Sequence, residues 1–167
     1  MRVARSRALT GLVVVLAAVV GAACSSGGSS ARPKPTPTTK SVIGGGLGTT
    51  VVFAHPSPYG TILTAALPAT LYVNVHDSRV HNTCTGQCAR TWLPLVTRGQ
   101  PQAGDGANAS LVGSFRRNDG RRQVTYNGHP LYTYRRDHQP LEATGQGAGG
   151  DWYVISASGD PVMGKPQ

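Results

Sequence analysis

The side chains of this 167-residue chain that are best suited to chemistry are its three cysteines. Cys84 and Cys88 form a close pair, and Cys24 stands alone near the N-terminus. A close pair of thiols can form a disulfide in an oxidising compartment, or can bind copper or zinc as thiolates. His76 and His81 lie just upstream and would add imidazole ligands to such a metal site. The spacing alone leaves both interpretations open.

Cys24 ends an N-terminal segment that has the order of an export signal. Three arginines precede an apolar stretch, which finishes in small residues. Gly21-Ala22-Ala23-Cys24 resembles the cleavage box of bacterial lipoprotein signal peptides. The resemblance implies a signal peptide at residues 1–23. It also implies a lipid on Cys24, with acyl chains such as palmitate, that attaches the protein to the cell membrane on its outer face.

Two other interpretations of this segment remain open. One is a plain secretory signal that is cut near Ala23 without lipid attachment, because Gly21 stands where a branched apolar residue is usual. The other is an uncleaved anchor. Spanning a bilayer takes about 20 apolar residues, and this stretch has about 16, which favours a cleaved signal.

Assigning Cys24 to a lipid leaves Cys84 and Cys88 as an even pair. In an exported protein such a pair favours a disulfide. The closed loop is short, so its effect on the entropy of the unfolded chain is modest, roughly 2 kcal/mol.

Composition divides the rest of the chain. Residues 24–42 are rich in Ser, Gly, Pro and Thr, which predicts a disordered tether. Residues 43–160 are enough for one compact domain, and 161–167 form a tail. The net charge of the whole chain is +9. Residues 43–167 together have ten basic and seven acidic side chains, a difference of +3 that does not suit a dedicated nucleic-acid binder.

Four arginines flank a predicted hairpin turn at Asn118-Asp119-Gly120. They are Arg116, Arg117, Arg121 and Arg122. One interpretation is a solvated strand edge, because charge on an exposed edge prevents pairing with other chains. The other is a binding patch for anionic lipid headgroups or cell-wall phosphates.

The chain repeats itself weakly at an offset of 60 residues, between about 59–96 and about 119–156. The matched pairs are Gly60 with Gly120, Leu71 with Leu131, Tyr72 with Tyr132, Asp77 with Asp137 and Trp92 with Trp152. Strand-like runs recur in both units, and Asn127-Gly128 is a strong hairpin signal. Along 71–76 apolar and mixed residues alternate, and each Asp is expected to close an Asx-turn. The sequence predicts an all-β domain, a small sandwich or barrel made of two related halves.

The second unit carries a complete Tyr-x-(Phe/Trp/Tyr)-x-x-Asp motif. Its residues are Tyr132, Tyr134 and Asp137, and the first unit keeps Tyr72 and Asp77 but has Asn74 in place of the aromatic. With Trp92 and Trp152, the pattern resembles the bacterial secreted-repeat lipoproteins. That resemblance implies extracytoplasmic placement and lipid anchoring, and it implies no established activity. The aromatic side chains can pack in the core or line a ligand surface.

No catalytic motif is present. The chain has no Gly-x-Ser-x-Gly, His-Glu-x-x-His or phosphate-binding loop, and Glu142 is its only glutamate. We therefore expect a non-catalytic binding module without a cofactor. Its partners would be the membrane, through the lipid, and a cell-wall or protein partner. The alternatives are an accessory role in copper handling or electron transfer and, next, an anionic wall- or lipid-binding module.

Overall fold

The computed structural model describes residues 48–66, 68–79 and 81–166. The predicted signal peptide, Cys24 and the tether all lie outside the described residues. These described residues form one compact unit. Among the described residues, no helix is both long and apolar enough to cross a membrane.

The described residues form short strands and almost no helix, which confirms the all-β class. The strands are β1 (Val51–Ser57), β2 (Gly60–Thr64), β3 (Tyr72–Asn74), β4 (Trp92–Pro94), β5 (Val96–Thr97), β6 (Gln102–Ala103), β7 (Val112–Arg116), β8 (Arg122–Tyr126), β9 (His129–Pro130), β10 (Tyr132–Tyr134) and β11 (Trp152–Val154). The helical elements are one turn, α1 (Cys88–Thr91), and the 3₁₀ turns η1 (Ala109–Leu111) and η2 (Ala148–Gly150).

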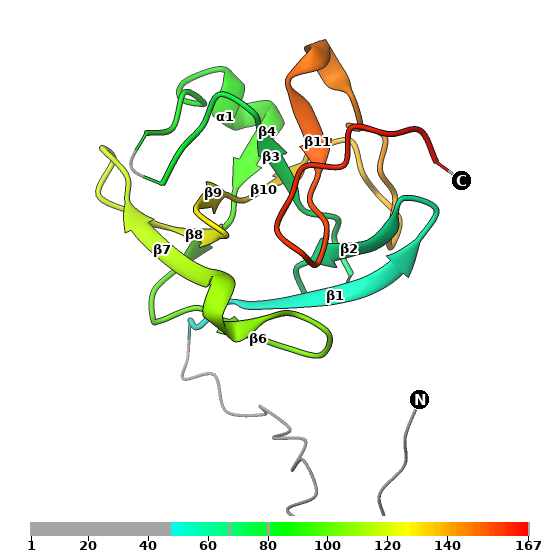
Figure 1. The fold of residues 1–167 in the computed structure, drawn as a ribbon. Coiled ribbons are helices and arrows are strands. Elements are labelled where there is room, and N and C mark those ends of the chain that lie inside the picture. The colour runs from blue at the N-terminus through cyan, green and yellow to red at the C-terminus, as the bar shows by residue number, and fades with distance from the viewer. Residues whose placement is uncertain (1–47, 67, 80, 167) are drawn as a thin grey trace, which may run out of the picture. The chain divides into compact units, whose positions relative to one another are not determined.

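These strands make three separate sheets and no closed barrel within the described ranges (Figure 1). The orders are β2-β1-β6, β11-β3-β10-β4 and β5-β8-β7, and β9 also pairs with β8. Only β1 and β6 pair in parallel; all other neighbours among these strands are antiparallel.

The β11-β3-β10-β4 sheet contains alternating strands from the two repeats. Its middle strands, β3 and β10, pair at Tyr72 and Tyr132, which are equivalent residues of the repeats. The outer strand β11, from the second repeat, pairs with β3 of the first. The outer strand β4, from the first repeat, pairs with β10 of the second. Each repeat therefore supplies a strand that the other needs, and the sheet has approximate two-fold symmetry.

The central strand β3 is buried on both faces. Leu71 and Val73 belong to one apolar cluster, together with Val124 and Leu131. Tyr72 belongs to a second cluster, which contains both tryptophans. On the predicted face of mixed polarity, Tyr72 and Asn74 are therefore also buried, whereas His76 beyond the strand is exposed. The second cluster covers this part of the face.

Two turns set the hairpins. Asn127 and Gly128, between β8 and β9, have φ of 49° and 84°. Positive φ at both central residues defines a type I′ turn, so the predicted Asn-Gly hairpin is confirmed. Gly60 and Gly120 occupy equivalent turns of the β1–β2 and β7–β8 hairpins, with φ of 83° and 82°. A side chain would strain both positions.

Candidate functional site

The motif tyrosines and aspartates bond across the repeats. The Tyr72 hydroxyl donates to Asp137 Oδ2 at 2.6 Å, and the Tyr132 hydroxyl donates to Asp77 Oδ2 at 2.5 Å. Each motif therefore supplies the tyrosine for one pair and the carboxylate for the other. Because each bond joins residues of different repeats, the exchange fixes one repeat against the other.

The second oxygen of each carboxylate holds a loop. Asp77 Oδ1 accepts from the backbone nitrogen and the hydroxyl of Thr83, both at 2.7 Å. Asp137 Oδ1 accepts from the same two groups of Thr144, at 3.0 and 2.5 Å. The predicted local Asx-turns are therefore wrong for both aspartates. Asn74 makes that turn instead, since its Oδ1 accepts from the backbone nitrogen of the residue two positions ahead, at 2.9 Å.

Burial sets the acid–base behaviour of the two tyrosines. Tyr72 and Tyr132 are fully buried. Loss of hydration, and then the hydrogen bond to a carboxylate, raise the pKa of each phenol well above its ordinary value. A phenolate beside Asp77 or Asp137 would be a second negative charge in the core. Both tyrosines therefore remain neutral donors.

The remaining motif rings pack on these tyrosines. Trp92 and Trp152 stack with ring centroids 4.0 Å apart and planes 3° from parallel. The ring centroids of Tyr134 and Trp92 are 4.3 Å apart. Tyr72 meets Trp92 edge-on at 5.2 Å, and Tyr132 meets Trp152 edge-on at 5.0 Å. The tryptophans are 6% and 7% exposed. The rings therefore form a core and leave little surface for a ligand.

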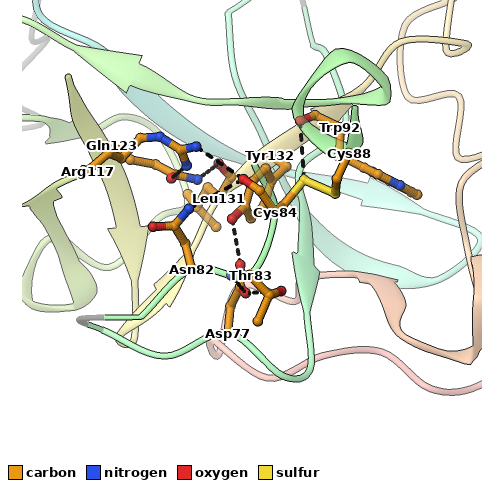
Figure 2. Close-up of a disulfide and its surroundings, with 10 residues drawn as sticks. All are labelled: Asp77, Asn82, Thr83, Cys84, Cys88, Trp92, Arg117, Gln123, Leu131 and Tyr132. Carbon is orange, nitrogen blue, oxygen red and sulfur yellow. Dashed lines mark hydrogen bonds between the residues drawn. A yellow bond between two sulfur atoms is a disulfide. The ribbon is translucent and has the colours of Figure 1, made fainter. Parts of the chain in front are cut away.

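Cys84 and Cys88 form the predicted disulfide, with sulfurs 2.04 Å apart (Figure 2). Cys88 begins α1, and Cys84 is buried in the aromatic cluster. The bond closes the tip of the loop that Thr83 ties to Asp77. Metal binding requires thiolates, and both sulfurs are used here in a covalent bond.

The candidate metal-binding histidines do not join the sulfurs. The His76 imidazole is exposed and lies 3.1 Å from Asp151 Oδ1. The backbone of His81 bonds to Ser78 in an exposed turn. Within the described parts of the chain, no three His, Cys, Asp or Glu side chains gather in a group that could hold a metal ion.

Arg117 differs from the surface cation that the sequence predicts, since it is only 5% exposed. Its guanidinium donates to Gln123 Oε1 at 2.5 Å and to the Cys84 carbonyl at 3.1 Å (Figure 2). Gln123 in turn donates to the Leu131 carbonyl at 2.8 Å. Arg117 also bonds Asp119 Oδ2 at 3.2 Å. Its charge therefore ties the β7–β8 hairpin to the disulfide loop and is not available to a ligand.

The other three hairpin arginines are exposed and line a groove of about 770 Å³. Sequence reasoning missed a fourth member, Arg98. It is remote from the hairpin in sequence but follows β5, which pairs with β8. Only strand pairing places it there, so no local signal could have revealed it. A second groove, of about 550 Å³, lies between the disulfide loop and the hairpin turn and includes Arg90, Arg117 and Asp119.

Together, these features define an all-β module of two interleaved repeats, joined by Tyr–Asp bonds and stabilised by a disulfide. Residues 113–156, which include the whole second repeat, match a family described as a secreted repeat of unknown function. The match confirms the resemblance drawn from the motif residues, and a secreted repeat points to an extracellular location. No curated protein and no solved structure matches the chain.

Proposed function

We propose that this protein is exported, carries a lipid on Cys24 and acts on the outer face of the membrane as a non-catalytic binding module. The observation that carries the proposal is the use of its reactive side chains inside the fold. The two thiols are bonded to each other, and the motif tyrosines are bonded to the motif aspartates.

A catalytic acid or base must reach its substrate and exchange a proton near neutral pH. Tyr72 and Tyr132 meet neither condition, because they are buried and their pKa values are raised. Asp77 is also buried, and it accepts three hydrogen bonds. These groups therefore serve to hold a rigid scaffold, which suits a module that presents a surface to a partner.

Export is supported by two independent observations. The second repeat matches a family of secreted repeats. A disulfide persists in oxidising compartments and is rare in the cytosol. Both agree with the signal-like segment that precedes Cys24. Metal handling has less support, since the histidines near the cysteine pair do not gather with it.

The mass of the mature N-terminal peptide tests the anchor. We expect the chain to begin at Cys24 with a diacylglyceryl increment, and we expect Cys24→Ser to release the protein into the medium. The matched control is the double variant Cys84→Ser/Cys88→Ser, which should stay with the membrane. An unmodified N-terminus, or equal retention of the Cys24→Ser protein, would reject the lipid anchor.

A further inference from the structure

The groove beside the β7–β8 hairpin gathers positive charge from two remote parts of the chain. Arg116, Arg121 and Arg122 come from the hairpin, and Arg98 follows β5. Threonines and glycines make up most of the remaining lining, and no carboxylate is part of it. All four arginines are exposed. The domain has only a small net charge, so this groove concentrates its positive charge.

Three of these arginines have no acidic partner in the part of the chain that the structure describes. Asp119 pairs with Arg121 at 2.8 Å and is shared with Arg117, so it offsets part of the Arg121 charge. Within the described residues, Arg98, Arg116 and Arg122 make no ion pair. Arg116 donates to the Gly120 carbonyl at 2.9 Å, and Arg122 donates to Ser114 Oγ at 3.2 Å. Each of these bonds uses one of five guanidinium donors and leaves the others for a ligand.

The strand register places like charges against each other. Arg116 lies directly opposite Arg122 across the β7–β8 pair, so their side chains leave the same face of the sheet. Like charges in this position destabilise a sheet. An anion bound between the two side chains would turn that repulsion into attraction. The pair therefore costs the folded protein stability that a bound anion would restore.

Arg98 is held at the groove by its contact with Gly48. The backbone nitrogen of Arg98 donates to the Gly48 carbonyl at 2.9 Å. A Cβ added to Gly48 would lie 3.0 Å from both Cβ and Cδ of Arg98, so the stem of Arg98 packs closely on this glycine. In the sequence, Gly48 follows the predicted tether (24–42) after only five residues.

We propose that this groove binds the phosphate groups of anionic phospholipid headgroups. Guanidinium groups bind phosphate in a bidentate manner, and several together suit a phosphate-bearing surface. The choice of membrane phosphate over soluble phosphate rests on the proposed lipid anchor, since Gly48 in the groove lining is close in sequence to the predicted tether. The groove would then hold the module against the membrane to which its lipid is attached.

The test uses the mature chain, residues 24–167, carrying Cys24→Ser so that no lipid contributes to binding. Co-sedimentation is measured with vesicles of phosphatidylcholine alone and with vesicles that contain phosphatidylglycerol. The groove variant is Arg98→Gln/Arg122→Gln. The matched control, Arg135→Gln/Arg136→Gln, removes two exposed charges outside the groove lining.

We expect binding only to the phosphatidylglycerol vesicles. Each arginine near an anionic surface contributes about fivefold to affinity, so the groove variant should lose about 25-fold. The affinity of the control variant should fall less than about threefold, because salt screens charges that lie away from the contact with the membrane. The thermal midpoint of the groove variant should not fall, since it removes a like-charge pair.

Three outcomes would overturn the proposal. They are equal losses in the two variants, no preference for phosphatidylglycerol, and groove-dependent binding of soluble polyphosphate without vesicle binding. The last would assign the groove to a soluble polyanion. Because no lipid is attached in these measurements, their failure leaves the anchor on Cys24 untouched, and the mass of the N-terminal peptide decides that question separately.

Discussion

Residues 75–91 and 135–151 are equivalent connections of the two repeats, and they are built differently. Each runs from a central strand to an outer strand, and in each a threonine bonds the motif aspartate. The first is closed by the disulfide, and Arg117 holds its Cys84 carbonyl. The second has no cysteine and is rich in glycine. Covalent closure and close glycine packing therefore serve the same end, which is to present Thr83 and Thr144 to the exchanged carboxylates.

The second connection has a glycine at position 145 because aromatic rings pack directly against it. A Cβ on Gly145 would lie 2.6 Å from the Trp92 ring and 3.1 Å from the Tyr134 ring. In the first repeat Asn74 stands at the position of Tyr134 and does not carry a ring. The complete motif of the second repeat therefore requires glycine at position 145, because a side chain there would meet the rings. In the first repeat, which lacks the aromatic at position 74, the connection is closed by a disulfide instead.

The largest expected loss of stability comes from the two aspartates. Asp77 is 5% exposed, whereas Asp137 is only partly buried. We expect Asp77→Ala to lower the free energy of unfolding by about 3 kcal/mol and Asp137→Ala by about 2 kcal/mol. Each change leaves a buried tyrosine hydroxyl unsatisfied, and water replaces the partly buried Asp137 carboxylate more easily than the buried Asp77 carboxylate. Urea denaturation measures both. A larger loss at Asp137 would contradict the asymmetry, and Asp77→Asn, which keeps the shape of the side chain, serves as the conservative control.

The disulfide should matter only to the first connection. We expect Cys84→Ser/Cys88→Ser to cost roughly 2 kcal/mol, because the unfolded chain loses a short covalent loop. Amide hydrogen exchange should increase in 75–91 and stay unchanged in 135–151. A reducing agent should lower the thermal midpoint of the wild type and leave that of the double variant unchanged. Equal loosening of both connections would show that the disulfide acts on the whole domain.

The corresponding change in the second connection is Gly145→Ala. We expect a loss of about 2 kcal/mol, because the added methyl group overpacks the rings of Trp92 and Tyr134. Gly164→Ala is the matched control, since nothing lies within 4 Å of a Cβ there. Its effect should stay within about 0.5 kcal/mol. If the two variants melted alike, close packing at Gly145 would not be what shapes this connection.

High pH should affect the two repeats equally. The pKa of Tyr72 and of Tyr132 is raised in the native state from an ordinary value of 10.0. Their contribution to stability is therefore intact below pH 10 and is lost as the pH rises above it. Above pH 10, each tyrosine lowers the free energy of unfolding by about 1.4 kcal/mol per pH unit. Thermal melts between pH 9 and 12 measure this loss of stability. Tyr132→Phe should remove about half of the loss that the two tyrosines cause. An equal loss in that variant would show that the buried phenols do not cause the loss of stability at high pH.

The sequence predicts the local elements well, and it does not predict how they exchange partners. The Asn127-Gly128 turn, the strand-like runs and the cysteine pair follow from short-range chemistry, and the structure confirms them. The bonds from Tyr72 to Asp137 and from Tyr132 to Asp77 join different repeats. The sequence pattern of one repeat does not show whether its tyrosine bonds the aspartate of the same repeat or of the other. Both arrangements would have the same sequence.

Two arginines show the same limit at the candidate site. Arg117 lies in a run of exposed cations, and only the register that brings it beneath Cys84 explains its burial. Arg98 lies alone in the sequence and reaches the groove through the pairing of β5 with β8. Charge clustering in the sequence therefore pointed to the hairpin that lines the groove, but it included the buried Arg117 and omitted Arg98. Strand pairing, which is non-local, decided both.

The smallest expected effect concerns a feature of the second connection alone. Glu142 Oε2 accepts from the backbone nitrogens of His138 and Gln139, at 2.5 and 2.8 Å, and these bonds lower the pKa of Glu142 from its ordinary value of 4.5. The first repeat has Asn82 at the equivalent position. The contribution of Glu142 is thus present above pH 4.5 and is lost as the pH falls below it. We expect amide exchange at positions 138 and 139 to increase more steeply below pH 4.5 in the wild type than in Glu142→Gln, with no such difference in 75–91. Identical profiles in the two proteins would mean that the carboxylate does not hold the turn, and that glycine packing alone closes the second connection.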